Sequence, residues 1–103
     1  TRLIEFKLLL AKIKLNKTEE VETLSKKYDY DDDSPFHYYA EAVMAYERED
    51  REKAEEWLRI CRRVFRMPEL LALWQDTLVS YGHIPSVYGG YLEDPSALTS
   101  PTP

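Results

Sequence analysis

The segment 29–33 holds the densest set of residues that could bind a metal ion, with aspartate at four of its five positions. Carboxylates at alternate positions are typical of a calcium-binding loop. The segment departs from that pattern, since Ser34 stands where such a loop needs glycine and Ala40 where it needs a bidentate glutamate. A solvated turn before a helix accounts for the same residues more simply. We therefore expect no metal and no other cofactor.

Candidates for nucleophilic catalysis are few. Cys61 is the single cysteine and lies on the apolar stripe of a predicted helix, and no phosphate-binding glycine loop accompanies it. His37 and His83 are far apart in sequence, and neither has a second ligand at metal-binding spacing. We predict that Cys61 serves packing and that the protein is not an enzyme.

Positive charge is concentrated in residues 59–66, which include Arg59, Arg62, Arg63 and Arg66. Guanidinium groups bind carboxylates and phosphates, so an acidic or phosphorylated partner is one interpretation. The other is that these arginines oppose the dipole of a helix whose early residues are acidic. The net charge of -5 disfavours nucleic acid and anionic membranes as general partners.

Apolar periodicity and helix-capping residues predict an all-α protein of about five helices. We expect helices over 3–15, from Asn16 to Tyr28, over about 35–48, from Asp50 to 66, and over 68–82. No apolar run approaches the roughly 18 residues that a bilayer requires, so a soluble protein is expected. The helical domain should cover 1–83, and the Pro-, Ser- and Thr-rich segment 84–103 should be extended or disordered. Nothing here indicates the cellular compartment.

An internal repeat is present in this pattern, because the expected turns at Asn16, Glu49 and Gly82 are each 33 residues apart. The clearest copy, over 38–65, resembles the tetratricopeptide repeat family. The matching positions are Ala42, Ala54, Leu58 and Cys61. The copy departs from the family where Tyr38 replaces the usual tryptophan. Further departures are Glu41, Glu49 and Arg51.

The resemblance covers residues 3–82 and implies a right-handed array of antiparallel helix hairpins, an α-α superhelix. The repeat copies would be 3–30 and 35–67, closed by a helix over 68–82. Because the repeat motif is a degenerate packing code, an unrelated five-helix bundle is the alternative.

The resemblance also implies a function, the binding of a peptide or partner protein in a concave groove lined by the first helix of each copy. The groove residues would be Leu3, Phe6, Leu10, Ile13, Lys14, Phe36, Tyr39, Val43, Tyr46 and Glu47. Some members of the family hold a C-terminal carboxylate with lysine and asparagine at positions that are here Phe6, Leu10, Tyr39 and Val43, so such a carboxylate clamp is not expected. The alternative is that the aromatic residues pack against the fifth helix or against the tail, where 88–91 carries two tyrosines around a glycine pair.

A second function is architectural, with the chain serving as the C-terminal end of a longer helical array. The run Leu8, Leu9, Leu10 cannot all face the second helix, so part of the first helix should be exposed. We expect Ile4, Leu8 and Leu9 to mediate self-association or to contact a preceding repeat. The identity of the partner cannot be inferred from these residues.

Overall fold

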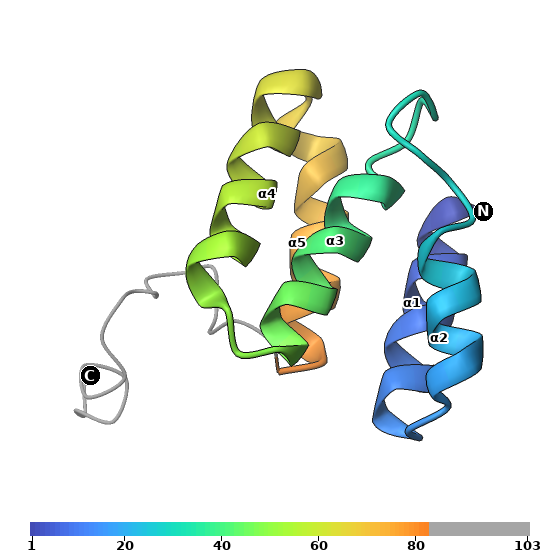
Figure 1. Ribbon diagram of the computed structural model, residues 1–103. Coiled ribbons are helices and arrows are strands. Elements are labelled where there is room, and N and C mark those ends of the chain that lie inside the picture. The colour runs from blue at the N-terminus through green and yellow to red at the C-terminus, as the bar shows by residue number, and fades with distance from the viewer. Residues whose placement is uncertain (83–103) are drawn as a thin grey trace.

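The computed structural model describes residues 1–82, and the expectations for His83, for 84–103 and for the tyrosines of 88–91 lie outside this range. Within 1–82 the chain forms five helices and no strand (Figure 1). Their bounds are α1 Arg2–Lys14, α2 Thr18–Ser25, α3 Phe36–Glu47, α4 Arg51–Val64 and α5 Pro68–Ser80. The all-helical class is therefore confirmed.

The helices form two hairpins and a closing helix. α1 packs on α2, α3 packs on α4, and α3 also contacts both helices of the first hairpin. In Figure 1, α3 lies between α4 and the α1–α2 pair, and α5 lies behind α3 and α4. α4 can approach α3 closely because the facing residues are small, and Ala42, Ala45 and Ala54 are fully buried.

Two helix starts, those of α4 and α5, lie where the sequence predicts them. The Asp50 carboxylate accepts a hydrogen bond from the Lys53 amide at 3.1 Å and so caps α4. Pro68 is the first residue of α5, where its missing N–H costs nothing. Before α3, the Ser34 hydroxyl accepts a hydrogen bond from the Phe36 amide at 3.3 Å.

Three helices end in the same way, at intervals of 33 residues. α1, α3 and α5 end at Lys14, Glu47 and Ser80, and the residue two positions later has a positive φ each time. These residues are Asn16 at 59°, Glu49 at 63° and Gly82 at 84°. Each donates its amide to the carbonyl three residues back, the inner hydrogen bond of a Schellman turn.

The expected start of the second helix at Asn16 is wrong. Asn16 adopts the left-handed conformation that ends α1, and Lys17 occupies the capping position of α2 without a side-chain hydrogen bond. Asparagine tolerates a positive φ better than most residues. Its backbone therefore forms the left-handed turn that ends α1, and its side chain does not cap α2. α2 starts at Thr18, later than expected, and it ends at Ser25, earlier than expected.

The core is aromatic where α1, α3 and α5 meet. Trp74 of α5 is 2% exposed, and its ring lies 5.1 Å from the Phe6 ring of α1 between centroids. It also lies 5.6 Å from the Tyr39 ring and 6.4 Å from the Phe36 ring of α3. One side chain of the last helix thus contacts both earlier hairpins.

Candidate functional site

The structure places half of the expected groove residues in the core. Phe6, Leu10, Phe36, Tyr39 and Val43 are all at most 2% exposed. A partner cannot reach these side chains in this conformation, so their assignment to an open groove is wrong. The alternative, that the aromatics pack against the fifth helix, describes them correctly.

The reason is the position of α5. Trp74 fills the space between α1 and α3 that would otherwise face a peptide, and burial raises the pKa of the Tyr39 hydroxyl well above its usual range. Tyr39 donates a long hydrogen bond of 3.4 Å to Oε1 of Gln75, the residue after Trp74. The space where the groove was expected is therefore occupied by α5.

The other five expected groove residues lie around this core. Leu3, Ile13 and Tyr46 are partly buried and pack against it. Lys14 and Glu47 are exposed at the ends of their helices, and the Lys14 ammonium lies 5.9 Å from the centre of the Tyr81 ring. These five residues do not form one continuous open surface with the five buried residues.

The residues expected to mediate self-association divide between two faces of α1. Ile4 is 63% exposed and Leu8 is 48% exposed, whereas Leu9 is fully buried. Leu9 belongs with Phe6 and Leu10 on the face that packs on α3, because residues three and four positions apart share one side of a helix. The inclusion of Leu9 in an exposed surface is therefore wrong.

The exposed apolar residues of α1 form one stripe, which we call the outer face of the first hairpin. Ile4, Leu8, Ala11 and Leu15 follow each other at spacings of four, three and four residues. Leu15, which sequence reasoning did not include, is 65% exposed. Its spacing from Leu8 was the signal that could have identified it.

Between α1 and α2 the outer face is hollowed. Leu8 and Leu24 line a shallow depression of about 680 Å³, with Lys12, Glu20 and Lys27 at its margin. Lys12 pairs with Glu20, and the Lys27 ammonium lies 2.6 Å from the Glu5 carboxylate. These ion pairs tie α1 to α2 beside the apolar floor and leave the floor itself open.

The Glu5 carboxylate joins the two helices through two donors. Besides Lys27, the Tyr28 hydroxyl donates to Glu5 at 2.7 Å. The hydrogen bond from Lys27, followed by that from Tyr28, holds the pKa of Glu5 below its ordinary value. The carboxylate is therefore ionised at neutral pH, which keeps the hairpin closed on this side.

The residues of the outer face have counterparts 33 positions later in the chain. Three of these counterparts lie next to another hairpin. The residues 33 positions after Leu8, Ala11 and Leu15 are Glu41, Met44 and Arg48 of α3. Those α3 residues share a hollow of about 240 Å³ with residues of α2, among them Glu22, Ser25 and Lys26. The three α3 residues thus face the preceding hairpin, whereas Leu8 and Leu15 are exposed. The counterpart of Ile4 is His37, whose ring contacts Trp57 of α4 instead.

Chemically reactive side chains are already engaged or buried. The Cys61 thiol is buried, and burial raises its pKa to about 12, so it is protonated at neutral pH. Asp32 accepts hydrogen bonds from Arg2 and Ser34, and His37 packs against the rings of Tyr38 and Trp57. Within residues 1–82 no three His, Cys, Asp or Glu side chains are grouped as metal ligands.

Two further properties of the chain are the length of its helices and its similarity to known proteins. Among the helices of residues 1–82, none has the length and apolar character needed to cross a bilayer. No protein-family model, no curated protein and no solved structure matches this chain.

Proposed function

We propose that this chain is a protein-interaction module of tetratricopeptide type, and that it binds a helix hairpin along the outer face of its first hairpin. The site is formed by Ile4, Leu8 and Leu15, with Ala11 between them. The proposal keeps the interaction function that the repeat resemblance implies. It places the binding surface on the outer face of the first hairpin instead of in the expected groove.

The spacing of helix ends supports the repeat interpretation. Three left-handed turn residues recur every 33 residues, and each follows the first helix of a unit. In helical-repeat proteins each unit buries one face against the next, so an apolar outer face needs a neighbouring unit or a partner to cover it. Ile4, Leu8 and Leu15 do not make a polar outer face.

The observation that carries the proposal is the register between α1 and α3. The stripe on α1 matches, 33 residues earlier, the α3 surface that faces α2. A helix held against α1 as α2 is held against α3 would cover Leu8 and Leu15. The depression beside Leu24 would widen the contact.

The occupant that we propose is the first hairpin of a second copy of the chain. A second copy supplies a helix hairpin of the right kind, and its own exposed stripe needs the same cover. Burying the exposed portions of three large apolar side chains contributes roughly 3–4 kcal/mol from each copy. The cost of association offsets much of this, so we expect a weak dimer that dissociates in about the millimolar range.

Light scattering over a concentration series tests this assembly. The wild-type chain should change from monomer to dimer, and Leu8→Glu should remain a monomer because a carboxylate would be desolvated in the interface. Leu73→Glu is the matched control, since Leu73 of α5 is similarly exposed at 53% but lies off the stripe. It should dimerise like the wild type.

Circular dichroism establishes that each variant is folded before its mass is interpreted. A wild-type chain that stays monomeric at every concentration would refute self-association and leave a preceding repeat or a hairpin of a different polypeptide as the occupant. A Leu8→Glu variant that dimerises as well as the wild type would show that the outer face is not the interface.

A further inference from the structure

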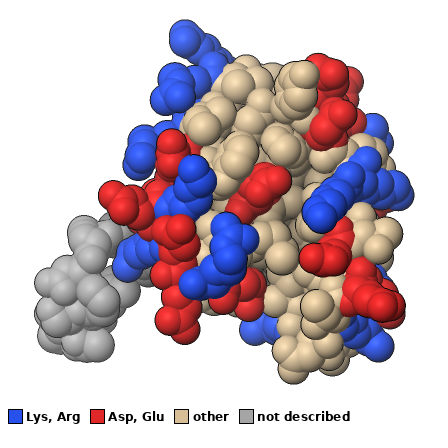
Figure 2. Space-filling view, in the orientation of Figure 1, with Lys and Arg blue, Asp and Glu red and all other residues tan. Residues whose placement is uncertain are grey.

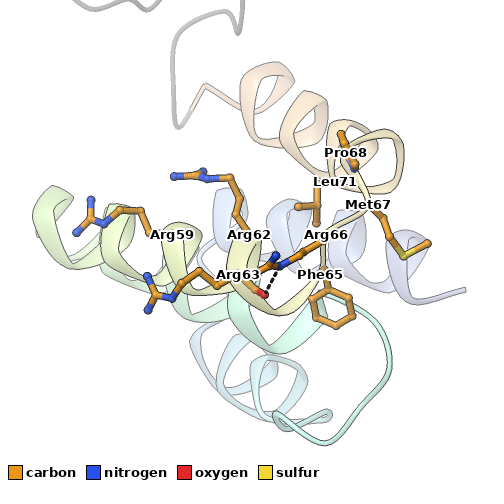
Figure 3. A pocket seen from close by; sticks show the side chains of 8 residues that line it. All are labelled: Arg59, Arg62, Arg63, Phe65, Arg66, Met67, Pro68 and Leu71. Carbon is orange, nitrogen blue, oxygen red and sulfur yellow. Dashed lines mark hydrogen bonds between the residues drawn. The ribbon is translucent and has the colours of Figure 1, made fainter.

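A second surface lies at the opposite side of the fold, where α4 ends and α5 begins. Residues 59–71 enclose a groove of about 600 Å³ between the two helices (Figure 3). Its lining consists of Arg59, Arg62, Arg63, Phe65, Arg66, Met67, Pro68 and Leu71. No residue of α1 contributes to it, so it is separate from the outer face of the first hairpin.

The floor of the groove is apolar and fixed in place. Leu71 is buried, and Phe65 is half-buried with its ring 6.1 Å from the ring of Tyr38 in a T-shaped contact. Met67 is 55% exposed and points away from the arginines in Figure 3. An apolar side chain entering beside Leu71 would therefore meet carbon rather than water.

The rim of the groove carries four guanidinium groups. In Figure 3 the side chains of Arg59, Arg62 and Arg63 extend to the same side of α4. Arg66 bends back, and its Nε donates to the Arg63 carbonyl at 3.5 Å. Figure 2 shows basic side chains gathered at this upper end of α4, whereas acidic and basic side chains are interspersed lower down.

These four arginines lack the partners that other cations of the same helix have. Arg51 and Lys53, at the start of α4, pair with Glu55 and Glu56 at 3.3 and 3.4 Å. Within the described part of the chain, no carboxylate lies at ion-pair distance from any of the four arginines of the groove.

The helix dipole explains only part of this arrangement. Arg62 and Arg63 occupy the last turn of α4, where positive charge is favourable. Arg59 lies a turn earlier and Arg66 lies beyond the end of the helix at Val64, so the dipole gives little reason for either. All four arginines lie on the rim of one groove.

We propose that this groove binds an acidic peptide segment, in which carboxylates flank an apolar side chain. The carboxylates would accept hydrogen bonds from the guanidinium groups, and the apolar side chain would lie on Leu71 and Phe65. Arg59 and Arg63 are four positions apart within α4, which corresponds to about 6 Å along the helix. In an extended peptide, two side chains separated by one residue are about 7 Å apart, so an acidic, apolar, acidic sequence fits this pair of arginines.

A peptide is favoured over nucleic acid for two reasons. The net charge of -5 would repel a long polyanion, whereas a short peptide contacts only the groove. The apolar floor has no role in binding a phosphate backbone, but it suits a side chain between two carboxylates. This inference does not depend on the outer face of the first hairpin and can hold whether or not the chain dimerises.

Fluorescence anisotropy with the full chain tests the proposal. The probe is a short fluorescein-labelled peptide in which glutamates flank a leucine. The wild-type chain should bind it, with affinity falling as salt is added. Arg63→Glu should weaken binding by about tenfold or more, and Arg63→Lys, which keeps the charge but loses the planar fork, should weaken it less.

Arg48→Glu is the matched control. Arg48 is exposed at the C-terminal end of α3, so this variant has the same change in net charge and a similar unfavourable charge at a helix end. It should bind the probe within about twofold of the wild type. Equal loss in both variants would show general charge attraction and overturn the proposal.

Three further results would also overturn it. The first is a wild-type chain that does not bind the glutamate peptide. The second is equal binding of a peptide with glutamines in place of the glutamates, since the arginines would then have no role. The third is binding of a phosphoserine peptide alone, which would assign the groove to phosphate instead of carboxylate. Circular dichroism of Arg63→Glu separates lost binding from lost folding.

Discussion

Replacing Trp74 with alanine tests whether α5 truly closes the concave side of the fold. In the structure the indole is almost fully buried and contacts three aromatic rings from α1 and α3. Alanine at this position would remove most of that contact surface and leave an apolar cavity between the two hairpins. If the concave side were an open peptide groove instead, the same change would remove only solvent-exposed surface.

The size of the effect follows from burial. Truncation of a buried tryptophan to alanine costs about 3–5 kcal/mol, and the ring pairs place this site in the upper part of that range. A domain of this size has roughly 5–10 kcal/mol of total stability, so Trp74→Ala should lower the midpoint of denaturant unfolding severely. Trp74→Phe, which keeps an aromatic ring, should cost about 1–2 kcal/mol and stay folded.

Urea unfolding followed by circular dichroism measures these differences. Trp57→Ala is the matched control, since Trp57 is only half-buried on α4 and should cost less than about 2 kcal/mol. Added indole should partly restore Trp74→Ala by entering the cavity, because a ligand that binds only the folded state raises its stability. A loss below about 1 kcal/mol for Trp74→Ala would refute the closed groove.

Two further changes test a turn and an ion pair. Glu49→Gly should stabilise the fold by roughly 0.5–1 kcal/mol, because Glu49 has a φ of 63° that glycine adopts without strain. Glu52→Gly inside α4 should destabilise the fold by about 1 kcal/mol. Equal effects of the two changes on stability in urea unfolding would contradict this reasoning. The hydrogen bond from Arg2 lowers the pKa of Asp32, so its contribution to stability is present above the ordinary aspartate pKa and is lost as pH falls through the lower, folded value. Stability curves between about pH 5 and pH 2 should therefore be flatter for Asp32→Asn, and parallel curves would contradict the reasoning.

Local sequence signals predicted the helices well. Asp50 and Pro68 mark the starts of α4 and α5 in the structure, because capping and a fixed φ act within a few residues. The 33-residue interval between turns also corresponds to a shared backbone conformation at Asn16, Glu49 and Gly82. Only α2 was misjudged, since one asparagine could not both end α1 and cap the next helix.

The surfaces were harder to predict than the helices. Leu8 and Leu9 are adjacent leucines, and a rotation of α1 by one residue decides which of them is exposed. Phe6 and Tyr39 line a core because α5 packs against α1 and α3, and without α5 they would line a groove. No local sequence pattern encodes where α5 packs. The arginines of residues 59–66 were evident, but their apolar floor includes Leu71 from the next helix.

The contact between the first helix and the last also bears on how the chain unfolds. In an open helical array each unit touches only its neighbours, so hairpins can melt one after another from either end. Here Phe6 of α1 meets Trp74 of α5 directly, which joins the two ends of the described chain into a ring of contacts. Loss of the first hairpin would remove the Phe6 ring and leave Trp74 only the α3 rings of Phe36 and Tyr39, so the first hairpin and α5 should unfold in a single cooperative transition.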